Sequence, residues 1–333
     1  MSSGATNEPA VFYLVAAALL GGTLTAGAQA RGTPSVNPQR PASSDASAST
    51  GSARGAGAAF AASFEGLGPV FESAGARFED TGAMLDGAEE VVESDEGGPA
   101  IWKATTSFLR SVRAGSIIGA DGRVRVRATT RFPARAIVLV TFSGGRCTGW
   151  MISKDTVATA GHCVHSGGSW HTDVRVFPGR SGSSSPYGSC RARRLHSVEG
   201  WIAAEDERYD YGAIKLNCTI GNTTGWLGLR RQPATLSGMT ATVAGYPDDK
   251  PLTQWKSTGA VTVVQPRQLF YRNDTALGQS GGPVYANDSD CGLCAVAVHT
   301  NGLHGQSPHS LANHGTRITQ EVFANFVRWK DAA

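Results

Sequence analysis

A serine stands inside a glycine-rich stretch in the last quarter of the sequence. It is Ser280, in Gly-Gln-Ser-Gly-Gly-Pro-Val at 278–284. Glycines let a backbone approach a substrate closely and let peptide N–H groups point at one spot, where they stabilise a developing oxyanion. Ser280 is therefore a candidate nucleophile, and the N–H groups of Gly278 and Ser280 are candidate oxyanion donors.

Two further residues have the chemistry to activate that serine. His162 stands in Thr-Ala-Gly-His-Cys at 159–163, and Asp210 stands in Tyr-Asp-Tyr-Gly-Ala-Ile at 209–214, at the entrance to an apolar run. Burying a carboxylate is costly unless it is paired, so Asp210 is expected to accept a hydrogen bond. A histidine can take the serine proton and later give it to a leaving amine, while the carboxylate fixes the imidazole tautomer. Each residue alone also fits a structural role, but together they predict a catalytic triad.

The elements that must position these residues are short strands. From residue 123 onward, β-type runs recur between Gly, Pro, Asn and Asp residues, which favours an all-β barrel or sandwich. The C-terminus alone predicts a helix, with Thr319 as its N-cap and an apolar face that packs on the β body. The expected strands are 136–142, 149–152, 174–177, 211–216, 241–244, 259–264, 284–285 and 295–299. The apolar face of the helix comprises Val322, Phe323, Phe326 and Val327.

The motifs around His162, Asp210 and Ser280 resemble those of the chymotrypsin superfamily, and residues 116–330 as a whole resemble its V8-like glutamyl endopeptidase branch. The resemblance implies two six-stranded antiparallel barrels, at about 123–230 and 231–317, followed by a helix at about 319–330. It places His162 and Asp210 in the first barrel and Ser280 in the second. The other matching segments are Ser-Ile-Ile-Gly (116–119), Cys-Thr-Gly-Trp-Met-Ile (147–152), Tyr-Gly-Ala-Ile (211–214), Gly-Tyr-Pro (245–247), Ala-Val-His-Thr-Asn-Gly (297–302) and Gly-Thr-Arg-Ile-Thr (315–319).

The same resemblance implies a serine endopeptidase that cleaves after glutamate. In that branch a pocket histidine and a threonine five residues before the nucleophile contact the substrate carboxylate, and these map to His299 and Thr275. Asp274 supports an alternative, because it lies six residues before Ser280, where trypsin-like enzymes hold the aspartate that binds Arg or Lys. A second alternative is an inactive relative that serves as a binding module, although all three triad positions are intact.

The composition before Ser116 differs from that of the rest. The apolar run at 11–20, followed by Ala-Gln-Ala at 28–30, predicts a signal peptide over residues 1–30, and the run is short of the roughly 20 residues of a membrane anchor. Residues 1–10 depart from the signal pattern, since they contain Glu8 and no Lys or Arg. Residues 31–66, rich in Ala, Gly, Ser and Pro, are expected to be disordered within a pro-segment of residues 31–115. The resemblance places the mature N-terminus of a peptidase domain (116–333) after Gly115, with Arg113 as another cutting point.

Charge also divides the chain at this point. The formal net charge is −5 before Ser116 and +8 from it onward. An acidic pro-segment that lies over a basic body is a natural inhibitor of it. No phosphate-binding loop or nucleic-acid-binding motif is visible, so we expect no nucleic-acid partner. We expect a secreted, monomeric enzyme that acts on polypeptide substrates, without a cofactor and without stable membrane association.

All six cysteines follow Ser116, and an even number in an exported chain argues for three disulfides. The resemblance implies the pairs Cys147–Cys163 and Cys291–Cys294, which leaves Cys190 with Cys218. Half a zinc site or a redox pair is the rival interpretation of Cys-Gly-Leu-Cys at 291–294, but no second such pair exists. The remaining histidines are expected on loops, without a metal; they are His165, His171, His196, His304, His309 and His314.

Overall fold

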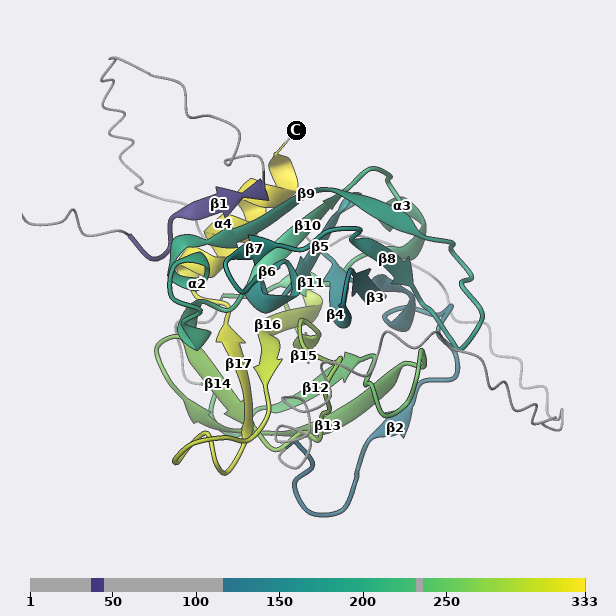
Figure 1. Cartoon of the computed structure of the whole chain (residues 1–333). Helices are drawn as coiled ribbons and strands as arrows, with labels where there is room; N and C mark the ends of the chain where they lie inside the picture. Colours follow the sequence, from purple (N-terminus) through teal and green to yellow (C-terminus); the bar gives the residue numbers. More distant parts are fainter. Residues whose placement is uncertain (1–36, 45–115, 232–235, 333) are drawn as a thin grey trace, which may run out of the picture. The chain divides into compact units, whose positions relative to one another are not determined.

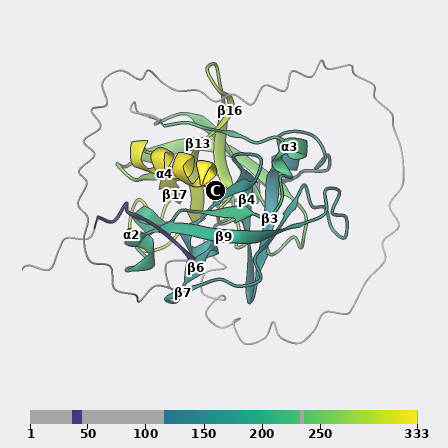
Figure 2. The same ribbon diagram turned by 90° about the horizontal axis from the view of Figure 1, so that it is seen from above.

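The computed structural model describes residues 37–44, 116–231 and 236–332. The signal peptide predicted for residues 1–30 lies outside the described residues, and so does the pro-segment except for residues 37–44. The described chain is built mainly from two antiparallel barrels and one C-terminal helix (Figures 1 and 2).

The first barrel closes because β9 pairs on both of its edges. The sheet runs β9-β10-β5-β4-β3-β8, and β8 pairs again with β9, so that six strands form a ring. β3 reads Ile-Val-Leu-Val-Thr-Phe and its first four residues are buried, as expected of a strand rich in β-branched side chains. The strands are β3 (Ile137–Phe142), β4 (Gly145–Met151), β5 (Thr156–Thr159), β8 (Arg175–Pro178), β9 (Cys190–Val198) and β10 (Gly212–Leu216).

The second barrel closes in the same way. Its path is β16-β15-β12-β13-β14-β17, and the β16–β17 pairing completes the ring of six strands. Two short strands are added outside this ring: β11 pairs in parallel with β16, and β2 pairs with β13. The barrel strands are β12 (Thr240–Gly245), β13 (Trp255–Val264), β14 (Gln268–Tyr271), β15 (Pro283–Asp288), β16 (Gly292–Asn301) and β17 (Asn313–Arg317), and the added ones are β2 (Val124–Arg125) and β11 (Gly228–Leu229).

Short elements lie in the connections before, within and after the first barrel. β6 and β7 form a two-stranded hairpin, and the described residues also include three 3₁₀ turns and two one-turn helices. Their bounds are β6 (His165–Ser166), β7 (Ser169–Trp170), η3 (Ala134–Ala136), η4 (Gly161–Cys163), η5 (Glu207–Tyr209), α2 (Glu199–Ile202) and α3 (Gly221–Thr224). Two of them, η4 and η5, bring His162 and Asp210 to the site described below.

The C-terminal helix α4 (Gln320–Asp331) packs on the first barrel, as expected from its apolar face. The Thr319 hydroxyl accepts the N–H of Val322, which confirms Thr319 as the N-cap. The buried face is rotated from the prediction, because Asn325 and Trp329 are buried whereas Phe323 and Val327 are only half-buried. The described residues contain no helix that is long and apolar enough to span a membrane.

Residues 37–44 form an ordered segment, so the prediction of disorder is wrong for this part of 31–66. β1 (Pro41–Ser43) pairs antiparallel with the end of β9, beyond the point where β8 pairs with it (Figure 1). The Gln39 carbonyl accepts a hydrogen bond from Asn325 at 3.1 Å, and the Gln39 side chain accepts one from the Tyr211 hydroxyl. A free strand edge and two buried polar side chains thus supply the partners that composition alone does not reveal.

Candidate active site

His162 forms a hydrogen-bonded pair with the buried Asp210 carboxylate. His162 lies in η4, and Asp210 follows η5 directly. The Nδ1 atom of His162 lies 2.7 Å from Oδ2 of Asp210, and the His162 backbone N–H donates to Oδ1 at 2.9 Å. The Asp210 side chain is 1% exposed and the His162 side chain 29%. The carboxylate therefore fixes the ring and leaves Nε2 as the nitrogen that can reach a neighbour.

Electrostatics sets the basicity of this histidine. Burial alone would lower the pKa of His162, but the charge of Asp210 and its hydrogen bond outweigh burial and raise the pKa above its usual value. Gly161 makes room for the pair, because a β-carbon there would lie 2.7 Å from the Trp201 ring and 3.0 Å from Oδ1 of Asp210. The small residue before His162 is thus required by packing.

The Ser280 turn lies against the segment that carries His162. A β-carbon on Gly281 would overlap the Thr148 carbonyl and the Thr159 hydroxyl, and Gly281 has a φ of +83°, which favours glycine. The Thr148 N–H donates to the Ser280 carbonyl at 2.8 Å. Ser280 is half-buried, and its Oγ donates to the Thr300 carbonyl at 3.2 Å. The structure therefore brings the Ser280 turn into contact with residues 159–160, just before His162.

Two peptide N–H groups of this turn have no hydrogen-bond partner within the described chain. They belong to Gly278, whose φ is +88°, and to Ser280. A β-carbon on Gly278 would lie 2.5 Å from both the Tyr246 carbonyl and Oδ1 of Asp248, so glycine is needed for this close approach. The turn leaves both groups available to an oxyanion.

His299 lies on β16 and is 2% exposed. The Tyr271 hydroxyl lies 2.7 Å from its Nδ1 atom. Burial raises the pKa of Tyr271, so the hydroxyl keeps its proton and donates it to Nδ1. Burial also lowers the pKa of His299 to about 3, which keeps the imidazole neutral with its remaining proton on Nε2. His299 is therefore a neutral imidazole that Tyr271 orients.

The carboxylate of Asp274 binds backbone N–H groups of this chain, unlike the aspartate expected in a trypsin-like pocket. Its Oδ1 accepts the N–H of Ile118 and its Oδ2 accepts the N–H of Gly122, both at 2.7 Å, and the residue is 6% exposed. The neighbouring Thr275 is fully buried, and its hydroxyl has no hydrogen-bond partner among the described residues. Asp274 thus anchors residues 118–122, whereas the Thr275 hydroxyl is unsatisfied.

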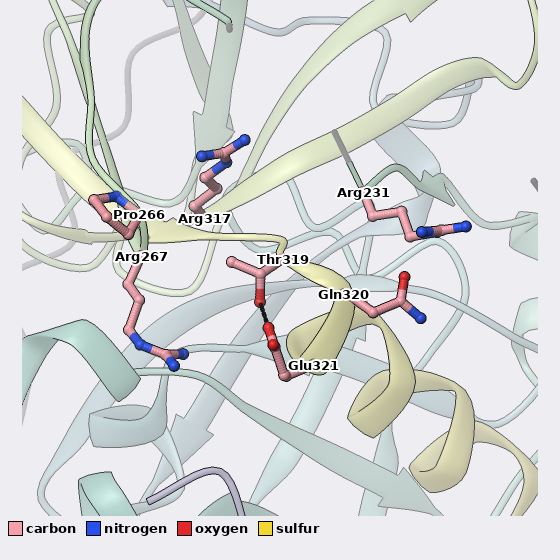
Figure 3. Close-up of a pocket in the computed structure, with 7 residues that line it drawn as sticks. All are labelled: Arg231, Pro266, Arg267, Arg317, Thr319, Gln320 and Glu321. Atoms are coloured by element: carbon pink, nitrogen blue, oxygen red, sulfur yellow. Dashed lines mark hydrogen bonds between the residues drawn. The ribbon is translucent and has the colours of Figure 1, made fainter. Parts of the chain in front are cut away.

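Two of the cavities on the surface of the described chain have volumes of about 350 and 310 Å³. Figure 3 shows one of about 350 Å³, and no member of the triad lines it. The other, about 310 Å³, is lined in part by Ser116 and Thr275, so it opens beside one of the predicted specificity residues. The cavity in Figure 3 is lined by Arg231, Pro266, Arg267, Arg317, Thr319, Gln320 and Glu321.

The three expected disulfides, Cys147–Cys163, Cys190–Cys218 and Cys291–Cys294, are present. The expectation that the remaining histidines lie on loops is wrong for three of them. His165 lies in β6, His196 in β9 and His314 in β17, and all three are buried. Their strands are short or rich in polar residues, so hydropathy gave no sign of them.

Sequence reasoning missed several residues that support the site. The Thr316 hydroxyl donates to the Asp210 carbonyl at 2.9 Å, and Tyr271 orients His299 as described above. The Asn313 side chain donates to the carbonyls of Ser116 and Asn273, at 2.7 and 2.6 Å. Thr316 belongs to the Gly-Thr-Arg motif at 315–317, and Asn313 lies just before it. That motif was therefore the available signal.

Comparison with known proteins agrees with this geometry. The trypsin family model matches residues 124–327. A glutamyl endopeptidase of Bacillus licheniformis is 48% identical over 225 residues, covering 66% of this chain and 70% of the relative. An extracellular metalloprotease of Bacillus subtilis is 43% identical over 230 residues, covering 66% and 72%. A solved structure of a Glu endopeptidase in complex with MPD aligns with a TM-score of 0.59 at 30% identity, over 65% of this chain and all of that one. The chain therefore belongs to the trypsin family of serine peptidases.

Proposed function

We propose that this protein is a secreted serine endopeptidase that hydrolyses peptide bonds after glutamate through an acyl-enzyme on Ser280. His162 takes the Ser280 proton as general base and returns it to the leaving amine, and Asp210 holds the imidazole and stabilises its cation. The observation that carries this proposal is the 2.7 Å contact between His162 and the buried Asp210 carboxylate, with the Ser280 turn packed on Thr159 of the His162 motif.

The peptide N–H groups of Gly278 and Ser280 form the oxyanion hole. Both point from a glycine-rich turn and neither is engaged by another described group. In the enzyme they bind the oxygen of the tetrahedral intermediate, and one such donor typically contributes about 3 to 4 kcal/mol to lowering the barrier. The Ser280 hydroxyl, which donates to the Thr300 carbonyl in the free protein, turns to His162 when substrate binds.

Glutamate specificity rests on His299 and Thr275. The Nε2–H of His299 and the buried, unpartnered hydroxyl of Thr275 supply two donors for a carboxylate. An ionised glutamate accepts charge-assisted hydrogen bonds from both donors, whereas a glutamine forms only weaker neutral ones, so glutamate is preferred. A glutamyl endopeptidase is 48% identical to this chain over 225 residues, which supports the same substrate class.

The contacts of Asp274 count against the trypsin-like alternative. Each of its oxygens accepts a backbone N–H from residues 118–122, and the residue is buried, so a substrate Arg or Lys has little access to the carboxylate. Desolvating the cation without a full partner would be costly. Asp274 is thus a structural residue in this proposal.

Activation frees the amine of Ser116. The Ser116 carbonyl accepts hydrogen bonds from the Thr275 N–H at 3.1 Å and from the Asn313 side chain at 2.7 Å. Cleavage after Gly115 therefore creates a positive charge that is tethered beside Thr275, where it favours an acidic substrate. The acidic pro-segment (31–115) inhibits the basic body until it is cut, and residues 37–44 tether it through β1.

The mature form acts as a monomer on polypeptides outside the cell, after a signal peptide of residues 1–30 has been removed. To test this proposal, the mature protein and its Ser280→Ala variant are treated with a fluorophosphonate and assayed on matched Glu and Arg reporter peptides. We expect labelling at Ser280, cleavage of the Glu reporter, and loss of both in the variant. An intact mature protein that is neither labelled nor active would support the inactive binding homologue instead.

A further inference from the structure

Four potential metal ligands come together outside the proposed catalytic centre. They are Glu207 in η5, His304 and His309 in the connection between β16 and β17, and His314 in β17. One ligand-capable atom from each lies within 4.8 Å of those of the other three. No established role of the triad or of the specificity pocket uses these four side chains.

Two of the histidine nitrogens lie close to the Glu207 carboxylate, each beside a different oxygen. The Nε2 atom of His304 lies 3.2 Å from one Glu207 oxygen, and Nε2 of His314 lies 3.4 Å from the other. A tetrahedral zinc ion with ligands at about 2.0–2.1 Å holds neighbouring ligand atoms about 3.3 Å apart. The imidazole centroids of His304, His309 and His314 are 4.8 to 5.1 Å apart, so the rings and the Glu207 carboxylate need to rotate to place one atom of each around a single ion.

The surroundings orient the ligands. Nδ1 of His304 lies 3.1 Å from the Gly302 carbonyl; a proton donated there leaves the Nε2 lone pair for a metal, as in most protein histidine sites. The backbone N–H of His304 donates to the backbone carbonyl of His309 at 3.0 Å, which fixes the two residues relative to each other. Phe270 packs on the other two rings, edge-on to His309 and stacked on His314.

The cluster has a rigid side and an open side. The His314 side chain is fully buried in the barrel, whereas the side chains of Glu207 and His304 are 38% and 44% exposed. An ion can therefore enter from solvent and meet a ligand that is already held in place. The described residues contain one further cluster of this kind, Cys147, His162 and Cys163, but its sulfurs are joined in a disulfide and cannot bind a metal.

We propose that Glu207, His304, His309 and His314 form a structural site for a zinc-class divalent ion. Three imidazoles and one carboxylate suit Zn²⁺ or its neighbours among the first-row transition metals, whereas Ca²⁺ and Mg²⁺ prefer oxygen ligands. Four protein ligands close the coordination shell, so the ion stabilises and does not catalyse. It ties the turn that ends at Asp210 to the loop between β16, which carries His299, and β17.

The test uses the full chain without a polyhistidine tag, carrying Ser280→Ala to prevent self-cleavage, and titrates it with Co²⁺ as a visible probe for zinc sites. We expect one Co²⁺ per chain, with the intense visible absorption of four-coordinate cobalt, displaced by one equivalent of Zn²⁺ and unaffected by excess Ca²⁺. His304→Ala and Glu207→Gln should each weaken binding by at least the 10- to 100-fold typical of losing an outer-shell partner. His171→Gln, which removes an imidazole outside the cluster, should leave binding unchanged.

Thermal unfolding provides the second readout. Zn²⁺ should raise the unfolding midpoint of the parent and of His171→Gln, and should not raise that of His304→Ala, because only a folded site binds the ion. Exposed His304 is chosen so that the variant folds, which its midpoint without metal verifies. Absence of stoichiometric binding, the pale absorption of six-coordinate cobalt, or equal binding by parent and His304→Ala would each overturn the proposal.

Discussion

Replacing Asp274 with Asn separates an anchoring role from a role in substrate recognition. In the structure both Asp274 oxygens accept backbone N–H groups, from Ile118 and Gly122, at 2.7 Å. Asn keeps the shape and one acceptor oxygen but turns an NH₂ group toward the other N–H. The variant therefore loses one charge-assisted hydrogen bond and opposes two donors.

The expected cost follows from these contacts. A hydrogen bond to a charged group contributes about 1.5–3 kcal/mol, and because Gly122 is exposed its freed N–H can be hydrated, so we expect a loss of about 2 kcal/mol. For a domain of 150–250 residues this lowers the melting temperature by about 4–8 °C. Asp290→Asn, at an exposed aspartate, serves as the matched control and should change stability by no more than about 0.5 kcal/mol.

The assay combines thermal unfolding of the mature protein with kcat/KM on Glu and Arg reporter peptides. Asp274→Asn should melt earlier and keep its preference for Glu over Arg. If it instead melts with the parent while Arg cleavage disappears, Asp274 recognises substrate and the anchoring interpretation is wrong.

Three further variants test the site. Asp210→Asn should reduce kcat/KM by about 10⁴-fold. In the parent, activity falls as the pH drops through the raised pKa of His162, above about 6.5, because the protonated ring cannot act as a general base. Without Asp210 this pKa is lower, so the acidic limb of the pH profile should move to lower pH. Tyr271→Phe removes the hydrogen bond to Nδ1 of His299, which contributes about 1.4 kcal/mol, and should therefore lower kcat/KM for Glu peptides by about tenfold. Labelling by the fluorophosphonate should persist. Gly281→Ala, which combines a positive φ with a steric overlap, should lose at least about 2 kcal/mol of stability by chemical denaturation.

Hydropathy identified most strands with apolar runs, although it missed β14 (Gln-Leu-Phe-Tyr), and it was insufficient for strands with polar sequences. Every strand expected from an apolar run is present, with ends that differ by a few residues. β9 was missed because it reads Cys-Arg-Ala-Arg-Arg-Leu-His-Ser-Val, with exposed or half-exposed arginines in its first half. β17 was missed because Asn-His-Gly-Thr-Arg is polar and yet mostly buried, since its side chains bind the carbonyls of Ser116 and Asp210.

Contacts between distant parts of the chain decided what sequence spacing left open. The spacing of Asp274 from Ser280 fits both a glutamate and an arginine pocket, and only its partners, 152 and 156 residues away, distinguish them. The same limitation hid the order in residues 37–44, whose composition fits a disordered segment but whose backbone completes the edge of β9. The His162, Asp210 and Ser280 motifs were easier to identify, because the chemistry of each requires the other two.

The central claim is tested most directly by the cleavage sites of the mature protein on a mixed peptide library, determined by mass spectrometry with Ser280→Ala as the blank. Cleavage after Glu, strongly preferred over both Gln and Arg, is the result that the contacts of His299, Thr275 and Asp274 predict. Cleavage mainly after Arg or Lys, or equal cleavage after Glu and Gln, would contradict it.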